Sequence, residues 1–221
     1  MSGRVLSHGV CLLSYLTCFF VLTGCVYTDE PMPVIEGQLP SSYIPVIRPA
    51  VTPPPRPADE TVPSAWMPPS TIEKRWTAII IHHSATTKGN ADIFDKCHRE
   101  IKHWDGVGYH FVIGNGTNSG NGQVEPTFRW RQQRTGAHCG GTPGNWANRD
   151  GVGICLVGDF DKTAPTWAQM RSLVKLVNFL QHRYKIPKSR IYGHGQTPGA
   201  NETKCPGRKF PMTRLKQMLD S

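Results

Sequence analysis

Ile79-Ile80-Ile81-His82-His83 decides the fold of this 221-residue chain, because a β-branched apolar run of this length is typical of a buried strand. Two histidines end the strand. A third, His194, lies 112 residues beyond His82, and Cys205 lies 123 residues beyond it. Two imidazoles and a thiolate are a complete protein ligand set for a catalytic zinc ion, whose fourth tetrahedral position is left for water. We therefore expect a metal-activated water in a cleft where these residues meet.

Further segments on both sides of this strand show helical or strand periodicity. Asn90 can cap a helix, and Thr166 with Gln169 forms a capping-box pattern. The Asn- and Gly-rich segment 115–122 is typical of a hairpin loop. The expected strands cover 77–83, 109–113, 123–125, 153–158 and 190–194, and the expected helices 90–104, 166–184 and 212–219. This alternation predicts an α/β fold, a single domain with a mixed central β-sheet flanked by helices.

The spacing of the histidines does not identify the ligand at the strand end. Successive strand residues point to opposite faces, so only one of His82 and His83 can face a shared metal. The alternative to a metal site is that each histidine is satisfied by hydrogen bonds and that Cys205 is inert. Against it, His82, His194 and Cys205 all stand at element ends, with Gly and Pro nearby.

The first 24 residues resemble a secretory signal peptide. Arg4 supplies positive charge, and the apolar run 10–22 is too short for a membrane span. The run ends in Leu22-Thr23-Gly24-Cys25, which resembles a bacterial lipoprotein box. By that resemblance cleavage precedes Cys25, which becomes lipidated. Val26 in place of an aspartate favours the outer membrane, facing the periplasm. The alternative is an ordinary signal peptide with a chance cysteine.

Residues 25–70 have the composition of a linker. Twelve of the 19 prolines fall between Pro31 and Pro69. Such a segment buries too little apolar surface to order itself, and it favours extended polyproline geometry. We expect it to tether a folded unit, residues 71–221, to the membrane through the lipid on Cys25. A length of about 150 residues suits one domain, which we expect to be a monomer.

The charge of the chain is concentrated in its folded part. Residues 1–70 carry three Lys or Arg against five Asp or Glu, and the remainder carries 22 against 11. A basic domain suits an anionic partner. The export signal argues against nucleic acid as this partner, so an anionic cell-wall polymer or membrane surface fits better. A surface kept soluble by its charge is the alternative.

Four cysteines remain in the folded part after Cys25. We expect Cys97 to be buried on a helix face with Ile93, Phe94, Ile101 and Trp104, and Cys155 to lie in an apolar strand. Cys139 stands in a glycine-rich loop and could pair with Cys97 in a disulfide.

Six motifs occur in a characteristic order along the domain. They are Ile-His-His-Ser-Ala-Thr (81–86), Gly-Tyr-His-Phe (108–111), Gly-Ala-His (136–138), Gly-Ile-Cys-Leu-Val-Gly (153–158), Gly-His (193–194) and Thr-Lys-Cys-Pro-Gly (203–207). Together they resemble the zinc-dependent N-acetylmuramoyl-L-alanine amidases, a family that includes phage amidase-type lysozymes and peptidoglycan recognition proteins. The resemblance spans about 75–210. It implies a Zn²⁺ cofactor, a peptidoglycan or muropeptide substrate, and hydrolysis of the amide between N-acetylmuramic acid and L-alanine.

The resemblance also implies roles for individual residues. It assigns His82, together with His194 and Cys205, to zinc. Tyr109 matches a tyrosine that lies beside the metal and hydrogen-bonds the reacting carbonyl or the water. Thr203 matches a position that holds lysine in the phage enzymes and threonine in recognition proteins that keep activity. Both are therefore expected to be catalytic.

The chain departs from the family pattern in two places. The cytosolic branch of the family, which recycles anhydro-muropeptides, carries a glutamate where Cys155 stands, a lysine where Thr203 stands and an aspartate where Cys205 stands. This chain therefore lacks the obvious carboxylate base of that branch. The loop 114–122 is longer than the corresponding phage turn, which puts the substrate preference in doubt. Two other functions stay open: a non-catalytic peptidoglycan-binding module, and a Cys–His peptidase with Cys205 or Cys139 as nucleophile.

Overall fold

The computed structural model describes residues 62–219. Within this part, five strands form one sheet in the order β3-β2-β4-β1-β5. The strands are β1 (Ala78–His83), β2 (Phe111–Ile113), β3 (Val124–Pro126), β4 (Gly151–Leu156) and β5 (Ile191–Gly193). β1 lies between β4 and β5 and pairs in parallel with both, while β3 pairs antiparallel with β2. The predicted mixed sheet of a single α/β domain is confirmed.

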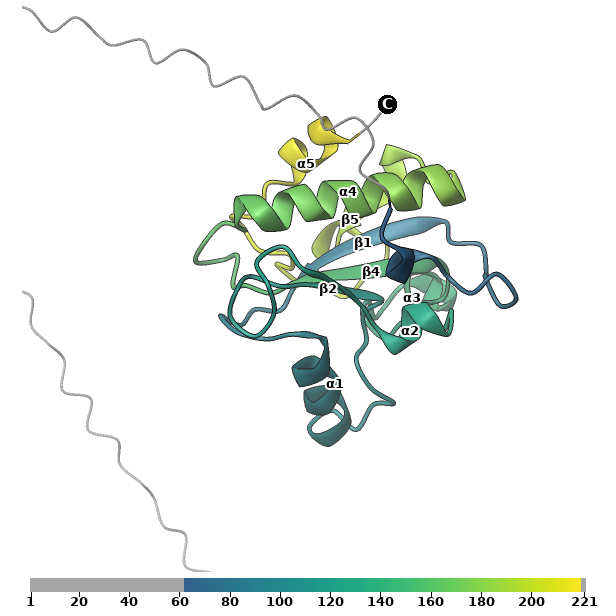
Figure 1. The fold of residues 1–221 in the computed structure, drawn as a ribbon, viewed down its shortest axis with the longest axis horizontal. Coiled ribbons are helices and arrows are strands. Elements are labelled where there is room, and N and C mark those ends of the chain that lie inside the picture. Colours follow the sequence, from purple (N-terminus) through teal and green to yellow (C-terminus); the bar gives the residue numbers. More distant parts are fainter. Residues whose placement is uncertain (1–61, 220–221) are drawn as a thin grey trace, which may run out of the picture. The chain divides into compact units, whose positions relative to one another are not determined.

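Helices cover both faces of this sheet (Figure 1). They are α1 (Ala91–Glu100), α2 (Phe128–Arg131), α3 (Trp146–Asp150), α4 (Trp167–Tyr184) and α5 (Met212–Met218), with 3₁₀ turns η1 (Ser64–Trp66), η2 (Pro143–Asn145), η3 (Lys188–Arg190) and η4 (His194–Gln196). The capping box predicted at Thr166 is present, because its hydroxyl accepts from Gln169 N and the Gln169 side chain accepts from Thr166 N. α4 and α5 lie on one side of the sheet and α1 extends from the other (Figure 1).

The alternation along β1 decides which histidine faces which layer. Ile79 and Ile81 join the main core cluster with residues of α4 such as Leu173. Ile80 instead packs with Ala147 of α3 on the opposite face. Because side chains alternate along a strand, His82 continues the α3 face and His83 continues the α4 face. The fold therefore separates the two neighbouring histidines by the thickness of the sheet.

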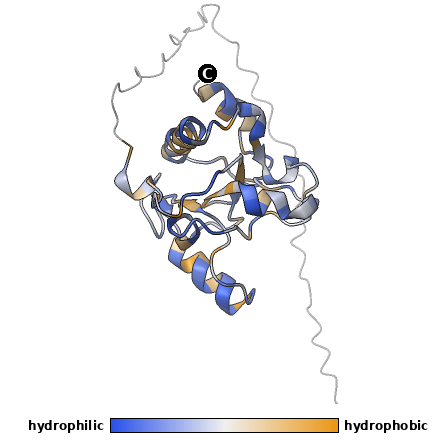
Figure 2. Ribbon diagram, turned by 90° about the vertical axis from the view of Figure 1, so that its right-hand side faces the viewer, coloured by the Kyte–Doolittle hydropathy of each residue, from blue (hydrophilic) through white to orange (hydrophobic). Residues whose placement is uncertain are grey.

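α1 is shorter and more exposed than its pattern predicts. It ends at Glu100, and the chain then turns through His103, which has a φ of 55°. The predicted buried face of this helix is wrong: Ile93, Ile101 and Trp104 are 44%, 68% and 43% exposed. Figure 2 shows hydrophobic colouring along parts of α1, the lowest helix in that view. The helix contacts the sheet mainly through buried Phe94, because it projects from the sheet instead of lying on it.

The folded unit begins before the predicted boundary at residue 71. Trp66 is only 5% exposed, packs near Phe179 of α4, and its carbonyl accepts from the indole N–H of Trp130 at 2.9 Å. The side chain of Trp66 anchors this segment to the domain. The proline-rich composition of residues 25–70 as a whole does not reveal the contribution of this one residue. The predicted signal peptide, residues 1–24, and Cys25 lie outside the described residues. Between residues 62 and 219, no helix combines the length and apolarity needed to cross a bilayer.

The four cysteines of the described part are free thiols. Cys97 is only half-buried, so its predicted burial is wrong, and no Cys97–Cys139 disulfide is formed. Cys155 is fully buried in β4, as its apolar neighbourhood predicts, and Cys139 is 1% exposed beside Ile80 and Ala147.

Candidate metal centre

Three potential ligands from distant parts of the chain meet at one end of the sheet. His82 is the penultimate residue of β1, His194 opens η4 directly after β5, and Cys205 stands in the loop before α5. One ligand atom from each of them lies within 4.8 Å of the others. Since β1 and β5 are adjacent and parallel, their carboxyl ends meet at the same sheet edge, which brings both imidazoles together. Their ring centroids are 4.6 Å apart.

The loop that carries Cys205 is held against the turn after β5. Gly195 N donates to the carbonyl of Cys205 at 2.7 Å. A Cβ atom on Gly195 would lie 2.2 Å from the Thr203 carbonyl oxygen, so only glycine permits this approach. The Thr203 hydroxyl accepts from Cys205 N at 3.2 Å. Thr203 therefore orients the backbone of the cysteine and stands beside the cluster.

Both ring nitrogens of His82 face polar groups. Its Nε2 lies 3.1 Å from Nδ1 of His138, and its Nδ1 lies 3.7 Å from the Cys205 sulfur. Burial lowers the pKa of His82 well below the usual value, and the neighbouring His138 and His194 add to the effect. Burial likewise lowers the pKa of His138 to about 3. Both rings are therefore neutral, as a metal-binding imidazole must be.

The side chains of His194 and Cys205 could each donate an electron pair to a cation. Within residues 62–219, the buried Nε2 of His194 has no hydrogen-bond partner. Burial raises the pKa of Cys205 to about 12, while the main-chain N–H of His83 donates to the sulfur and opposes this rise. The protein alone thus favours a neutral thiol, whereas a coordinated divalent cation would favour the thiolate. An unpartnered imidazole nitrogen beside a half-buried thiol fits a metal ligand set.

Tyr109 lies beside the cluster on the same face of the sheet. Its ring centroid is 5.2 Å from that of His82, and its hydroxyl contacts the thiol of Cys155. Burial raises the pKa of Tyr109 well above the usual value, so the hydroxyl keeps its proton. The Thr127 hydroxyl donates to the Tyr109 carbonyl at 2.7 Å and fixes its backbone. The tyrosine is thus a neutral hydrogen-bond donor held close to the candidate ligands.

His83 is directed away from this cluster. Its Nδ1 accepts from Phe160 N at 3.0 Å, and the two rings lie 5.8 Å apart. Of the two strand-end histidines, the structure therefore brings only His82 together with His194 and Cys205.

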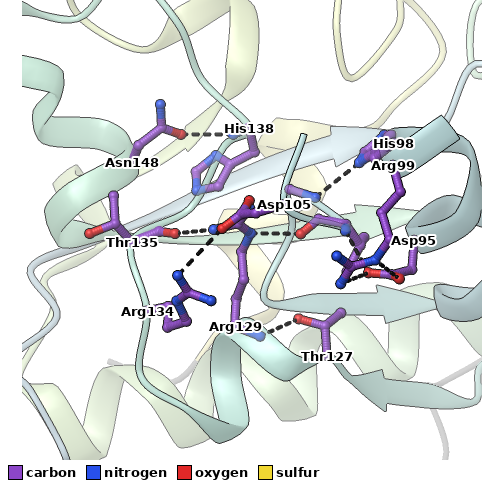
Figure 3. A network of polar contacts seen from close by, with 12 residues as sticks. Asp95, His98, Arg99, Asp105, Thr127, Arg129, Arg134, Thr135, His138 and Asn148 are labelled. Atoms are coloured by element: carbon purple, nitrogen blue, oxygen red, sulfur yellow. Dashed lines mark hydrogen bonds and ion pairs between the residues drawn. The ribbon is translucent and has the colours of Figure 1, made fainter. Parts of the chain in front are cut away.

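A polar network around the buried Arg129 holds the loops next to the site (Figure 3). Arg129, 4% exposed, donates to the carbonyls of Val107 and Thr135 at 2.6 Å and 2.5 Å and pairs with Asp105. It therefore joins the loops that precede Tyr109 and His138. Sequence reasoning missed this arginine, because a lone basic residue is indistinguishable from surface charge until its burial is known.

His138 was also missed as a site residue. Its Gly-Ala-His motif contributes to the resemblance, but no strand or helix end marks this histidine, since it lies in a long irregular loop. The carboxamide of Asn148 in α3 accepts from the backbone N–H of His138 at 2.7 Å (Figure 3). This tertiary contact helps to place the histidine against His82.

Comparisons with known proteins agree with the fold. Residues 73–208 match the family model of N-acetylmuramoyl-L-alanine amidases. Peptidoglycan-recognition protein SC2 of Drosophila melanogaster is 30% identical over 137 residues, which are 58% of this chain and 66% of that protein, so the chain spans just under two thirds of this relative. Amidase LysC of Clostridium intestinale superimposes with a TM-score of 0.54 at 26% identity, over 65% of this chain and 84% of that one. Bumblebee PGRP-SA superimposes with a TM-score of 0.52 at 25% sequence identity, over 66% of this chain and 83% of that one. The chain belongs to the N-acetylmuramoyl-L-alanine amidase family.

Proposed function

We propose that this chain is a zinc-dependent amidase that hydrolyses the bond between N-acetylmuramic acid and L-alanine in peptidoglycan or its fragments. The convergence of His82, His194 and Cys205 within 4.8 Å carries the proposal. Two imidazoles and one sulfur suit zinc, and three protein ligands leave a position open for chemistry. The unpartnered Nε2 of His194 supports the same ligand set.

A second function, binding peptidoglycan without cutting it, has support from the comparisons. They include both amidases and proteins named for peptidoglycan recognition. The ligand cluster alone would serve either function. Tyr109 favours hydrolysis, because the hydroxyl of this half-buried tyrosine keeps its proton beside the cluster and is suited to stabilise a developing oxyanion.

Each side chain has a distinct part in the proposed reaction. His82 and His194 would hold the metal as neutral imidazoles, and Cys205 as a thiolate. When bound, zinc supplies a Lewis acid that lowers the pKa of water toward about 7 and offsets negative charge on the amide oxygen. Tyr109 donates its hydroxyl hydrogen to that oxygen as charge develops. Thr203 orients the Cys205 backbone and offers a hydroxyl to the water or the amide.

Metal removal tests the proposal. Treatment of the purified protein with 1,10-phenanthroline, followed by dialysis, is expected to abolish release of stem peptides from peptidoglycan, and added Zn²⁺ is expected to restore it. Mass spectrometry should find free peptides that begin with L-alanine. A Cys–His peptidase would keep its activity after chelation. A pure binding module would release no peptide with or without zinc, and either outcome would refute the amidase.

We further propose that Cys25 carries the lipid that anchors the protein to the cell envelope, with the outer membrane as its destination. The apolar segment 10–22 followed by Leu22-Thr23-Gly24-Cys25 supports this. In cells fed an alkynyl fatty acid, the full chain is expected to incorporate the label and Cys25→Ala to lose it. Cys18→Ala, a cysteine within the apolar segment, is the matched control and should stay labelled. Labelled Cys25→Ala would contradict the anchor.

A further inference from the structure

We infer that His138 is a positioning residue that fixes the tautomer and the orientation of His82. The inference rests on the proposed function, since it concerns how His82 is presented to a zinc ion. It assigns no contact between His138 and the metal. Its basis is a chain of hydrogen bonds that begins at a backbone carbonyl and ends at the ligand cluster.

The chain of hydrogen bonds determines which nitrogen of each ring carries hydrogen. Nε2 of His138 lies 3.3 Å from the carbonyl oxygen of Gly151, which can only accept. This nitrogen therefore carries the hydrogen, and Nδ1 of the neutral ring keeps a lone pair. Nδ1 lies 3.1 Å from Nε2 of His82, which must then donate. The lone pair of His82 is left on Nδ1, the nitrogen that faces Cys205 at 3.7 Å.

The ring of His138 occupies a cradle built from glycines. A Cβ atom on Gly153 would lie 2.4 Å from Cδ2 of His138, and a Cβ atom on Gly136 would lie 2.5 Å from the same atom. No larger residue at either position leaves room for the imidazole. Asn148 holds the backbone of the loop by accepting from the N–H groups of His138 and Cys139 at 2.7 Å and 2.9 Å. The space required by the His138 ring thus explains the first glycine of Gly-Ala-His (136–138) and of Gly-Ile-Cys-Leu-Val-Gly (153–158).

Burial makes His82 dependent on this neighbour. His82 is 1% exposed and His138 is 8% exposed, so bulk water has little access to their contact. Without His138, the Nε2–H of His82 would be a buried donor without its partner, and the opposite tautomer would place hydrogen on the metal-facing nitrogen. Loss of such a supporting hydrogen bond commonly lowers metal affinity by about 10–100-fold.

His110 is a matched control in the same core. It is fully buried, its Nε2 lies 3.0 Å from the carbonyl of Arg134, and its Nδ1 accepts from Gly153 N at 2.9 Å. Its donor and acceptor pattern is that of His138. Its ring packs against that of His138, with centroids 5.6 Å apart, but both of its nitrogens bond backbone groups. Removing it should therefore destabilise the fold while His138 still accepts from His82.

Zinc affinity of the purified full chain, measured by competition with a chromophoric chelator, tests the inference. His138→Leu is expected to raise the dissociation constant by about 10–100-fold and to shift the visible spectrum of the Co²⁺-substituted protein. His138→Asn, whose Oδ1 takes the place of Nδ1, is expected to recover most of the affinity. His110→Leu should bind zinc like the wild type while unfolding at lower urea concentration. Equal losses in both leucine variants would overturn the inference and leave a purely structural role.

A measurement on the wild type covers the case in which a variant does not fold. The ¹⁵N NMR shifts of the labelled imidazoles should show hydrogen on Nε2 in both His82 and His138, with and without zinc. Hydrogen on Nδ1 of His138 would refute the inference. The proposed function fails separately, because in that case the wild type itself would bind no zinc.

Discussion

His82→Ala is expected to abolish zinc binding and to lower the amidase rate by more than about 10³-fold. The substitution removes one of the three ligand atoms that lie within 4.8 Å of one another. A catalytic metal contributes several kcal/mol of charge stabilisation in the transition state, and each 1.36 kcal/mol is a factor of about ten in rate. Zinc content by atomic spectrometry and release of stem peptides by mass spectrometry measure the two effects.

His83→Ala is the control for this experiment, since it removes the neighbouring imidazole on the other face of the sheet. It leaves Phe160 N without its acceptor, which should cost about 1–3 kcal/mol in the free energy of unfolding. The folded fraction should still bind one zinc ion and retain part of the activity. If His83→Ala lost zinc and His82→Ala kept it, the choice of ligand would be wrong.

Tyr109→Phe is expected to bind zinc normally and to hydrolyse peptidoglycan about 10²–10³-fold more slowly. The phenylalanine keeps the ring that packs 5.2 Å from His82 and loses only the hydroxyl. Removing one donor to a developing oxyanion typically has an effect of this size, provided that the donor acts in the transition state. The loss should fall on kcat with zinc stoichiometry unchanged, which separates it from damage to the metal centre.

Tyr192→Phe is a suitable control for the tyrosine. Tyr192 is a half-buried tyrosine of β5 that packs near Trp146, and no catalytic role is proposed for it. It should turn over like the wild type. Wild-type turnover by Tyr109→Phe would exclude the role proposed for its hydroxyl and would favour the binding module.

Local patterns predicted the parts of the fold that depend on neighbouring residues. The β-branched run before His82 is β1, and the Thr166 capping box begins α4 where predicted. Prediction failed where the outcome depended on distant packing. The apolar face of α1 appeared suited to burial, but the helix projects from the sheet and leaves Ile101 68% exposed. Trp66 joined the core although its surroundings have the composition of a linker.

The same division holds for the candidate site. The sequence by itself determined the ligand types, their order along the chain, and the rule that adjacent strand residues face opposite sides, because these depend only on residue chemistry and strand geometry. Tertiary structure alone decided that β1 and β5 are neighbours, that His82 faces Cys205, and that His138 lies behind His82. Those contacts join residues 56 to 123 positions apart, and no local propensity encodes which distant side chains will meet when the core packs.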